Sequence, residues 1–410
     1  MSILILNQNS YEFFPYKEWL EEVSEEVIFL TSSSVGKEYT SKPFLYFEIF
    51  DNYESGIVER RAKQLYEKYQ YDSVLALHEF DILRAAKIRE SLDISGQSFE
   101  NALRYRNKIH MKSILQKNNN IELPYFQEMN YPLEAVDFIE QHGYPVIIKP
   151  ADGGGSMGTL VVKNESDLES FLKKMIMFHF SDAQPSNNLM IETYIAGEMY
   201  HVDGYIQNNE LVLIRASKYL ENSLIYLDQN DISGSHLLPS DNELSKRLVQ
   251  ETKKVIQDLG SPDSMIFHAE FFHTADDRLV FCEIASRPGG ARIIEMIEVA
   301  YDLHITKAFT QFTCGALPSL PEVKEKKLVG HVVPIPKEGK LLYAPTEAPF
   351  PWIVRYHLSC QLGTVFHGVV HSSHHIAYMI VEAESEKQLK HRLYEANQWF
   401  RDTCVWEKAE

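Results

Sequence analysis

Several polar residues follow directly after apolar runs, where their side chains could act on a bound molecule. Lys149 follows the apolar run 144–148, and residues 152–158 carry glycines at 153, 154, 155 and 158. Glycine lets backbone amides approach phosphate oxygens, and a lysine ending a buried strand needs an anionic partner. The spacing fits neither a Walker A loop nor a GxGxxG turn before a helix. We expect the loop to join two strands and fold over phosphates as a flap; a flexible hairpin tip with a solvent-reaching lysine is the plainer alternative.

Two glutamates occupy matching positions near the ends of adjacent expected strands. Glu270 belongs to the segment 265–272 and Glu283 to the segment 278–284. Carboxylates that converge from neighbouring strands make an oxygen-ligand site suited to Mg²⁺, which also takes phosphate oxygens. Arg287 follows four residues after Glu283, and a guanidinium there suits binding a carboxylate and stabilising charge on a transferring or tetrahedral oxygen. Together with Lys149 these residues indicate nucleotide chemistry, and a structural ion-pair cluster is the alternative.

Other polar groups give weaker signals. The segment 192–198 links two expected modules, where an adenine could sit against backbone groups and a carboxylate could take ribose hydroxyls. Isolated histidines are more often core residues than ligands, and no paired cysteine or carboxylate spacing accompanies the C-terminal ones. We therefore expect polar or core roles, and no metal site, for His201, His236, His268, His371, His374 and His375.

The elements that position these residues follow from hydrophobic periodicity. The first hundred residues alternate apolar runs with helical patterns, which predicts a parallel α/β unit ending near Gly96. A basic amphipathic helix is expected over 101–117, and a compact αβ module that could move as a lid begins at Pro124. The chain becomes β-rich from Gly197, with a hairpin turn at Asn208-Asn209. Strands are expected near Tyr125 and over 3–6, 27–30, 73–76, 146–149, 159–162, 189–192, 201–206, 211–215, 265–272 and 278–284, and helices over 16–22, 53–69, 133–141, 167–175, 244–259, 293–303 and 386–402.

Length and composition exclude several classes of function. A chain of 410 residues suggests two or three cooperating units. The net charge of −18 argues against a nucleic-acid or membrane-surface binder, which needs basic patches. The four cysteines lie far apart without a CxxC pair, so we expect neither disulfides nor zinc. Residues 1–6 lack a basic n-region and no apolar stretch approaches about 20 residues, which predicts a cytoplasmic protein.

The ordered set of motifs resembles the ATP-grasp superfamily, in particular its carboxylate–amine ligases of the L-amino-acid (dipeptide) ligase type. The resemblance covers about residues 70 to 320, and the remainder fits the flanking parts of that family. It implies an α/β (α+β) ATP-grasp fold with an N-terminal parallel α/β domain over 1–100, a central part with a small αβ lid over 101–195, and a C-terminal catalytic domain over 196–410 that is β-rich from about 326. The motifs are Arg106-Asn-Lys108 with Met111-Lys112, Ile147-Ile-Lys-Pro150 with the glycine loop, the segment 192–198, Phe267-His-Ala-Glu270 and Glu283-Ile-Ala-Ser-Arg-Pro-Gly-Gly290.

The resemblance also implies a role for individual residues. The lysines would contact ATP phosphates and the base, the loop would cover the phosphates, and the segment 192–198 would hold adenine and ribose. Mg²⁺, or Mn²⁺ in its place, would be held by Glu270 and Glu283. Many relatives supply a third ligand two residues after the second glutamate, where this chain has Ala285, which leaves the number of metals open. The ATP-binding residues would be Lys108, Lys149, Gly154, Gly155, Ser156, Met157, Glu192, Tyr194, Ile195 and Glu198.

The implied reaction joins a carboxylate to an amine through an acyl phosphate, releasing ADP and phosphate, and its product would be an amide, most often a dipeptide. Arg287 would act on the acyl phosphate and tetrahedral intermediate, and His236, in the stretch 235–239, would line the amino-acid site. Gly290 and Ala291 would line the acyl pocket. Glu79 could favour a basic substrate, unless it belongs to a solvated helix start.

Two other functions stay open at this point. One is an ATP-grasp ligase that joins an amino acid to another amine or a carrier-bound acceptor in natural-product biosynthesis. The other is a nucleotide-binding regulatory protein without turnover, which the presence of both glutamates and Arg287 argues against. The expected partners are small-molecule amino acids, and similar ligases are often homodimers through the N-terminal region.

Overall fold

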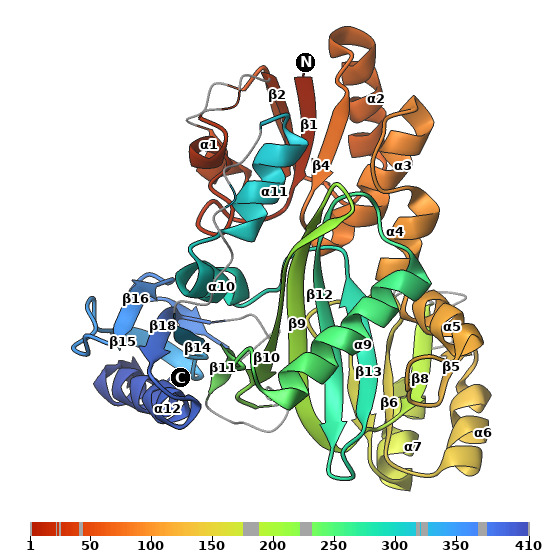
Figure 1. The fold of residues 1–410 in the computed structure, drawn as a ribbon, viewed down its shortest axis with the longest axis vertical. Coiled ribbons are helices and arrows are strands. Elements are labelled where there is room, and N and C mark those ends of the chain that lie inside the picture. Colours follow the sequence, from red (N-terminus) through yellow and green to blue (C-terminus); the bar gives the residue numbers. More distant parts are fainter. Residues whose placement is uncertain are drawn as a thin grey trace.

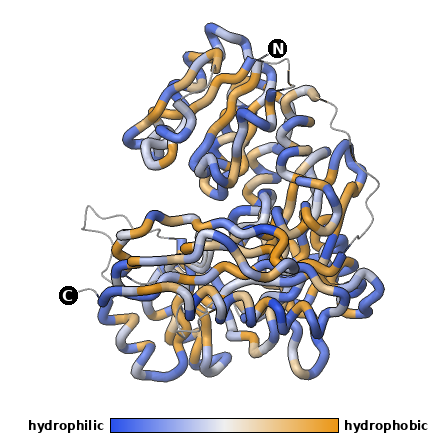
Figure 2. The backbone as a smooth tube through the Cα atoms, turned by 90° about the vertical axis from the view of Figure 1, so that its left-hand side faces the viewer, coloured by the Kyte–Doolittle hydropathy of each residue, from blue (hydrophilic) through white to orange (hydrophobic). Residues whose placement is uncertain are grey.

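The computed structural model describes residues 2–21, 23, 26–40, 44–174, 188–221, 232–316, 320, 327–367 and 375–408. Its described elements form four sheets (Figure 1). Hydrophobic residues lie inside, along the strands of the N-terminal unit and of the largest sheet (Figure 2). None of the described helices is long and apolar enough to cross a membrane. His371 and His374 lie outside the described residues.

The N-terminal unit is a parallel sheet in the order β3-β2-β1-β4, as expected. β1 is buried along its whole length, which accounts for its continuous apolar sequence. β3 was not expected, although its sequence YFEIF is apolar except at Glu48; it is an aromatic edge strand that is mostly half-buried. The elements are β1 Ser2–Asn7, α1 Tyr16–Trp19, β2 Glu26–Ser32, η1 Gly36–Tyr39, β3 Tyr46–Phe50, α2 Ile57–Tyr69, β4 Ser73–Ala76, η2 Glu79–Asp81 and α3 Ile82–Leu92.

The single basic helix expected over 101–117 is wrong. Two helices, α4 Phe99–Arg106 and α5 Lys108–Asn118, meet at Asn107, whose backbone is extended (φ −101°, ψ 110°). Asn107 caps α5 by accepting from the backbone N–H of His110 at 2.9 Å, as Asn side chains commonly do. The break turns basic side chains inward instead of toward solvent: Arg106, Lys108 and Lys112 are buried.

A small antiparallel sheet in the order β5-β8-β6-β7, here called the lid sheet, matches the expected αβ module. Its core packs against α6 and α7. The glycine loop connects β6 to β7, as expected. The elements are β5 Phe126–Met129, α6 Pro132–His142, β6 Val146–Pro150, β7 Leu160–Val162, α7 Glu165–Lys174 and β8 Leu189–Thr193.

The largest sheet has eight strands in the order β13-β12-β9-β10-β11-β14-β18-β16. Side chains of β9 and β12 such as Val202 and Phe267 pack beneath α9 with Leu248 and Val255. The opposite face carries His201, Tyr219 and Glu270 and is called the site face below. The elements are β9 Gly197–Gln207, β10 Glu210–Tyr219, β11 Ser233–Leu237, α9 Glu243–Leu259, β12 Met265–Thr274, β13 Leu279–Ala285, β14 Leu328–Val333, β16 Ile353–Leu358 and β18 Ala377–Ala383.

The β-rich segment after residue 326 continues this sheet, because β14, β18 and β16 extend it beyond β11. A three-stranded sheet, β17-β15-β19, lies beyond, and α12 packs on β14 and β18. The domain limits at 100, 195 and 326 stay predictions. The remaining elements are α10 Ile293–Tyr301, α11 Ile305–Thr313, β15 Gly339–Tyr343, β17 Val365–Phe366, α12 Glu386–Thr403 and β19 Val405–Glu407.

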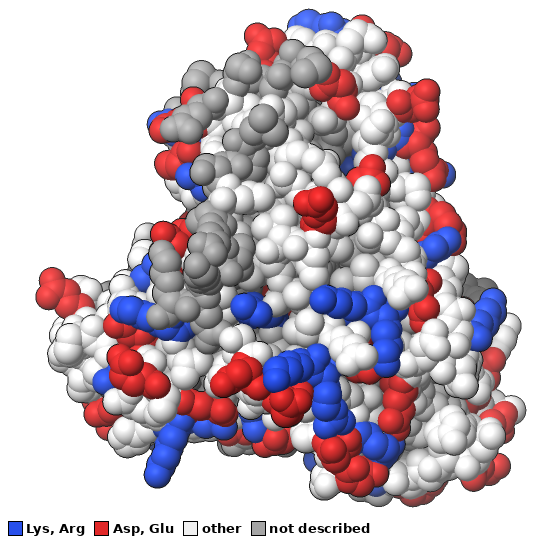
Figure 3. Space-filling view, viewed as in Figure 1, with Lys and Arg blue, Asp and Glu red and all other residues white. Residues whose placement is uncertain are grey.

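The outer face of α9 carries charges of both signs. Lysine and arginine side chains gather there beside acidic ones (Figure 3). Lys246 pairs with Glu243 and Lys254 with Glu251, each three residues apart on the helix. Such a mixed face is typical of a solvated helix surface.

Candidate functional site

Two adjoining cavities form the candidate site. The first, of about 800 Å³, lies between the lid sheet and the site face of the large sheet. The second, of about 450 Å³, is bounded by the N-terminal sheet and residues 287–295. Glu270, Glu283, Gly154, Ser156 and Met157 line both cavities, so ligands bound in the two would meet there.

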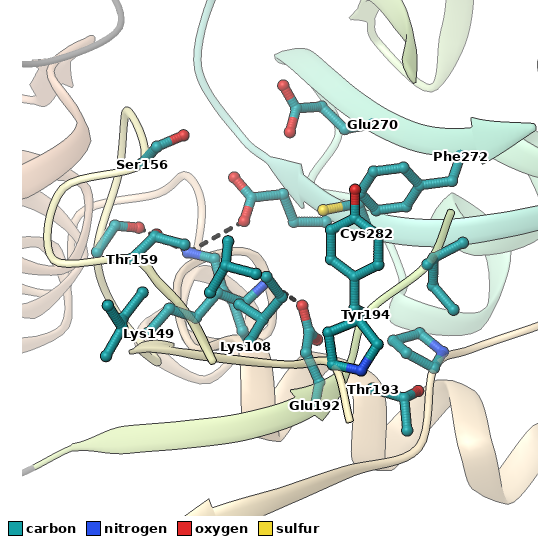
Figure 4. A pocket seen from close by; sticks show the side chains of 18 of the residues that line it. Lys108, Lys149, Ser156, Thr159, Glu192, Thr193, Tyr194, Glu270, Phe272 and Cys282 are labelled. Carbon is teal, nitrogen blue, oxygen red and sulfur yellow. Dashed lines mark hydrogen bonds and ion pairs between the residues drawn. The ribbon is translucent and has the colours of Figure 1, made fainter. Parts of the chain in front are cut away.

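A buried ion triad forms one wall of the first cavity. Lys112 donates to Oε2 of Glu192 at 2.5 Å. Lys149 donates to Oε1 of the same carboxylate (Figure 4). Burial alone would raise the pKa of Glu192, but the two lysines lower it to about 2. Both oxygens of the Glu192 carboxylate thus accept hydrogen bonds from lysines. Only the backbone of Glu192 is left to bind an adenine. Lys149, expected at the phosphates, is likewise held by Glu192.

An apolar slot lies beside this triad. Its walls are Ile147 of β6, Met199 of β9, Phe272 of β12 and Cys282 of β13, and the rings of Tyr194 and Phe272 face the same space in Figure 4. A flat aromatic base would find apolar contact on several sides here. The members of the segment 192–198 that line the cavity are Glu192, Thr193, Tyr194 and Ile195.

Glu198, expected at the ribose, lies away from this slot. Its side chain is 60% exposed and accepts a hydrogen bond from Lys218 at 2.5 Å and from Tyr200 at 3.0 Å. Among the described residues, the cavity wall contains the neighbouring Met199 but not Glu198. In this conformation the structure therefore does not bring Glu198 together with the other expected ATP-binding residues.

The glycine loop is held in place by two buried cations from α4 and α5. Lys108 donates to the carbonyl of Gly153 at 2.6 Å, and Arg106 donates to that of Asp152 at 2.7 Å. Gly155 and Ser156 both adopt left-handed backbone angles, with φ of 59° and 58°. Gly154, Ser156 and Met157 line both cavities and Gly155 lines the second, so the loop forms a roof where phosphates were expected.

Glu270 and Glu283 stand directly opposite each other on β12 and β13, as expected from the sequence. Tyr219 donates to Oε1 of Glu270 at 2.7 Å, and the bonds described for this carboxylate leave Oε2 without a partner. Oε2 of Glu283 lies 3.1 Å from Nζ of Lys108. Two carboxylates facing a shared cavity fit the oxygen ligands that Mg²⁺ or Mn²⁺ takes, and Ala285 adds none.

Arg287 is tied to the N-terminal sheet through Glu79. Glu79, which follows β4, accepts hydrogen bonds from both Arg287 and Arg106. Burial opposes ionisation, but the guanidiniums lower the pKa of Glu79 to about 2. With its side chain 13% exposed, Glu79 is not part of a solvated helix start, so that interpretation is wrong. Glu79 lines the second cavity while it is paired with two arginines, and its role toward a basic substrate stays a prediction.

His236 was expected beside the substrate, and the structure places it on the other face of the sheet. It pairs with Lys218 across β10 and with Gly330 across β14, whereas its neighbour Ser235 pairs with Tyr219 on the site face. Strand side chains alternate between faces, so the His236 ring lies on the side covered by α12. Burial lowers its pKa to about 4, and His236 is absent from the described lining of both cavities.

The second cavity contains the residues expected at the acyl pocket. Gly290 and Ala291 line it, and Ala291 has a left-handed φ of 49°. Arg292 also has a left-handed backbone (φ 74°). Its guanidinium carbon lies 3.8 Å from the ring centre of Phe13 and 4.0 Å from that of Tyr378, so the side chain stacks between the two rings. Arg292 thereby joins the N-terminal unit, the loop after β13 and the C-terminal strands at this cavity.

A buried group of polar residues on the site face was not recognised as a unit in the sequence. Asp203 accepts from Nδ1 of His201 at 2.5 Å and from Nδ1 of His268 at 2.8 Å. Although burial opposes the charge, Asp203 raises the pKa of His268 to about 9. Each histidine is a hydrogen-bonded core residue, as expected. The available signal was alternation: His201 and Asp203 lie two apart on one strand, beside His268 and Glu270 on the next.

Comparisons with known proteins show which family and which fold the chain resembles. Residues 142–295 match the ATP-grasp domain family. The chain is 24% identical over 401 residues to an L-arginine-specific L-amino acid ligase from Bacillus subtilis, covering 96% of this chain and 95% of that protein.

Solved structures show the same fold. An L-amino acid ligase from Bacillus licheniformis superposes with a TM-score of 0.76 at 17% identity, covering 100% of this chain and 99% of the other. An N5-carboxyaminoimidazole synthetase from Staphylococcus aureus, complexed with ADP, gives 0.68 at 17% identity, with 97% and 96% covered.

Fold, site and family match together define the class: the chain carries an ATP-grasp domain over residues 142–295, within the mixed α/β architecture expected from its sequence. Within that class it resembles the carboxylate–amine ligases of the L-amino-acid ligase type over its whole length, and it is an ATP-dependent ligase.

Proposed function

We propose that the protein condenses an L-amino acid with a second amino acid, using ATP and an acyl-phosphate intermediate. The single observation that carries the proposal is the meeting of the two cavities at Glu270 and Glu283, with Lys108 and Arg287 alongside. A nucleotide in the first cavity and a carboxylate in the second would bring their reacting atoms together at that point.

ATP would occupy the first cavity with its base in the slot formed by Ile147, Met199 and Phe272. Its phosphates would run beneath the glycine loop toward Lys108, which balances their charge. Glu270 and Glu283 would hold Mg²⁺, or Mn²⁺, which when bound neutralises phosphate charge and orients the γ-phosphate. These residues act chiefly by positioning and electrostatics, as is general for phosphoryl transfer.

The first substrate would lie in the second cavity with its carboxylate facing the γ-phosphate. A carboxylate oxygen attacks that phosphorus, the bond to the β-phosphate oxygen breaks, and ADP and an acyl phosphate result. The amine of the second substrate then attacks the acyl carbon, phosphate leaves with the electrons of the carbon–oxygen bond, and the amine gives up a proton. Arg287, held by Glu79 beside this cavity, would stabilise the charge that develops on the acyl oxygen. The loop 152–158 would keep water from the intermediate.

Release of ADP and phosphate in the presence of single and paired amino acids with Mg²⁺ and ATP tests this proposal. We expect particular pairs to stimulate release, and mass spectrometry to detect the condensed product. Arg287→Lys should lower turnover while ATP still binds. Arg278→Lys changes an exposed arginine directly before β13, at the end of the strand away from Arg287, and serves as the matched control. Release of AMP would refute the acyl-phosphate route.

ATP binding without turnover for any amino-acid pair would favour one of the two other functions. A product formed only with another amine or a carrier-bound acceptor would indicate a natural-product ligase, and no product at all would indicate a nucleotide-binding regulator. The expected homodimer is tested separately by light scattering on the purified chain.

A further inference from the structure

A chain of buried polar side chains crosses the site face and ends at Glu270. It begins at His331 on β14, whose Nδ1 lies 3.3 Å from Oγ of Ser235 on β11. Ser235 lies 2.8 Å from Nε2 of His201 on β9. Asp203 then bridges His201 to His268, whose Nε2 lies 3.4 Å from Oε1 of Glu270.

Asp203 is the centre of this chain. Its carboxylate is fully buried, yet the two imidazoles keep its pKa well below the usual range despite that burial. Because both Nδ1 atoms face Asp203, both rings present Nε2 outward, His201 toward Ser235 and His268 toward Glu270. A buried carboxylate with these two contacts fixes the orientation of both rings.

The same carboxylate also supports the loop that carries Arg287. A side chain at Gly289 would place its Cβ 2.7 Å from Oδ1 of Asp203 and 3.0 Å from Nδ1 of His268. Glycine therefore permits a close approach of the loop backbone to this pair. Arg287 is two residues away, so a displacement of Asp203 would reach both Glu270 and Arg287.

We propose that Asp203, with His201 and His268, is a positioning residue that sets the Glu270 carboxylate and seats residues 286–290. Oε1 of Glu270 is held from two sides, by Tyr219 at 2.7 Å and His268 at 3.4 Å, which turns Oε2 to the cation site. The inference rests on the proposed role of Glu270 as a metal ligand. Partners that orient a metal-binding side chain typically change metal affinity by roughly 10- to 100-fold.

Binding of Mn²⁺ to the full-length protein, followed through the electron paramagnetic resonance signal of the free ion with ADP present, tests the proposal without turnover. We expect Asp203→Asn to weaken Mn²⁺ binding at least about tenfold, while ADP affinity measured in EDTA stays unchanged. Tyr219→Phe removes the other hydrogen bond to Oε1 of Glu270 and should also weaken Mn²⁺ binding. His236→Gln replaces an equally buried histidine on the opposite face and should leave Mn²⁺ affinity as in the wild type.

The outcomes separate this inference from the proposed function. A folded Asp203→Asn protein that binds Mn²⁺ as tightly as the wild type overturns the positioning role alone. If Asp203→Asn does not fold, His201→Asn carries the same test from the far side of the carboxylate, and an unchanged affinity there has the same meaning. If Glu270→Gln binds Mn²⁺ like the wild type, the metal role of Glu270 fails and the positioning role with it.

Discussion

Replacing Glu79 with glutamine separates two accounts of this residue. The sequence predicts that Glu79 attracts a basic substrate, whereas in the structure it is an internal counter-ion for Arg106 and Arg287. Glutamine keeps the size of the side chain but removes the negative charge between two guanidiniums. In the structural account the damage is therefore independent of the substrate.

The magnitude follows from the pKa of Glu79, which the arginines lower from 4.5 to about 2. That difference corresponds to about 3 kcal/mol of favourable interaction, at about 1.4 kcal/mol per pH unit, similar to the 3–5 kcal/mol typical of breaking a buried ion pair. Because the folded pKa is depressed, this stabilisation is present above about pH 4.5 and is lost as the pH falls toward 2.

We expect Glu79→Gln to lower the free energy of unfolding in urea by about 3 kcal/mol at pH 7. Displacement of Arg287 should lower kcat/KM by up to about 100-fold, the equivalent of that energy, and by the same factor for basic, acidic and neutral amino acids. Glu90→Gln, on a partly exposed glutamate of the same N-terminal unit, is the matched control and should change neither quantity. The reasoning would be refuted if Glu79→Gln kept the wild-type free energy of unfolding and lost kcat/KM only with arginine and lysine as substrates.

Three further predictions concern buried charges. Glu192→Gln should destabilise the fold by about 3–5 kcal/mol in urea by leaving two lysines unpaired, and adding Lys112→Met should recover part of it; no recovery would contradict the triad. Burial raises the pKa of Asp81 from 3.8 to about 7. Asp81→Asn should therefore stabilise the fold at pH 8, by at most about 4 kcal/mol, but not at pH 3. Equal changes in the free energy of unfolding at the two pH values would refute this. Lys108→Met should tighten Mn²⁺ binding at Glu283 in the absence of nucleotide and weaken ATP binding, both measured by calorimetry. An unchanged Mn²⁺ affinity would show that Lys108 does not compete with the cation for the Glu283 carboxylate.

Much of the fold could be predicted because local patterns determine it. The β9–β10 hairpin forms at Asn208-Asn209, and both residues have the positive φ that a two-residue type I′ turn requires. The helix break at Asn107 was missed because amphipathic periodicity continues across it. What ends α4 there is a local cap together with a tertiary bond, from the N–H of Lys108 to the carbonyl of Ala151.

In the candidate site, too, some features could be predicted from the sequence and others could not. The hairpin of β12 and β13 brings Glu270 and Glu283 near each other, as their spacing predicts, but their direct opposition depends on a register shift between Glu270 and Phe271. Without that shift Glu270 would pair with Cys282, and no sequence pattern predicts it. The two partners of Glu79 lie 27 and 208 residues away and those of Glu192 lie 43 and 80 residues away, and no local pattern determines them. His236 matched a motif, but only the register of β11 against its neighbours decides which face its side chain occupies.

The paired charges of the cleft suggest why an ATP-grasp site can hold so many buried ions before substrates bind. Lys108 sits 3.1 Å from Glu283, where a divalent cation would otherwise balance that carboxylate. Arriving phosphates would draw the lysine away and free the carboxylate for the metal that accompanies them. The Glu283 carboxylate thus keeps a positive partner throughout, first Lys108 and then the cation. An uncompensated buried charge is costly, so this exchange would favour binding metal and nucleotide together rather than separately.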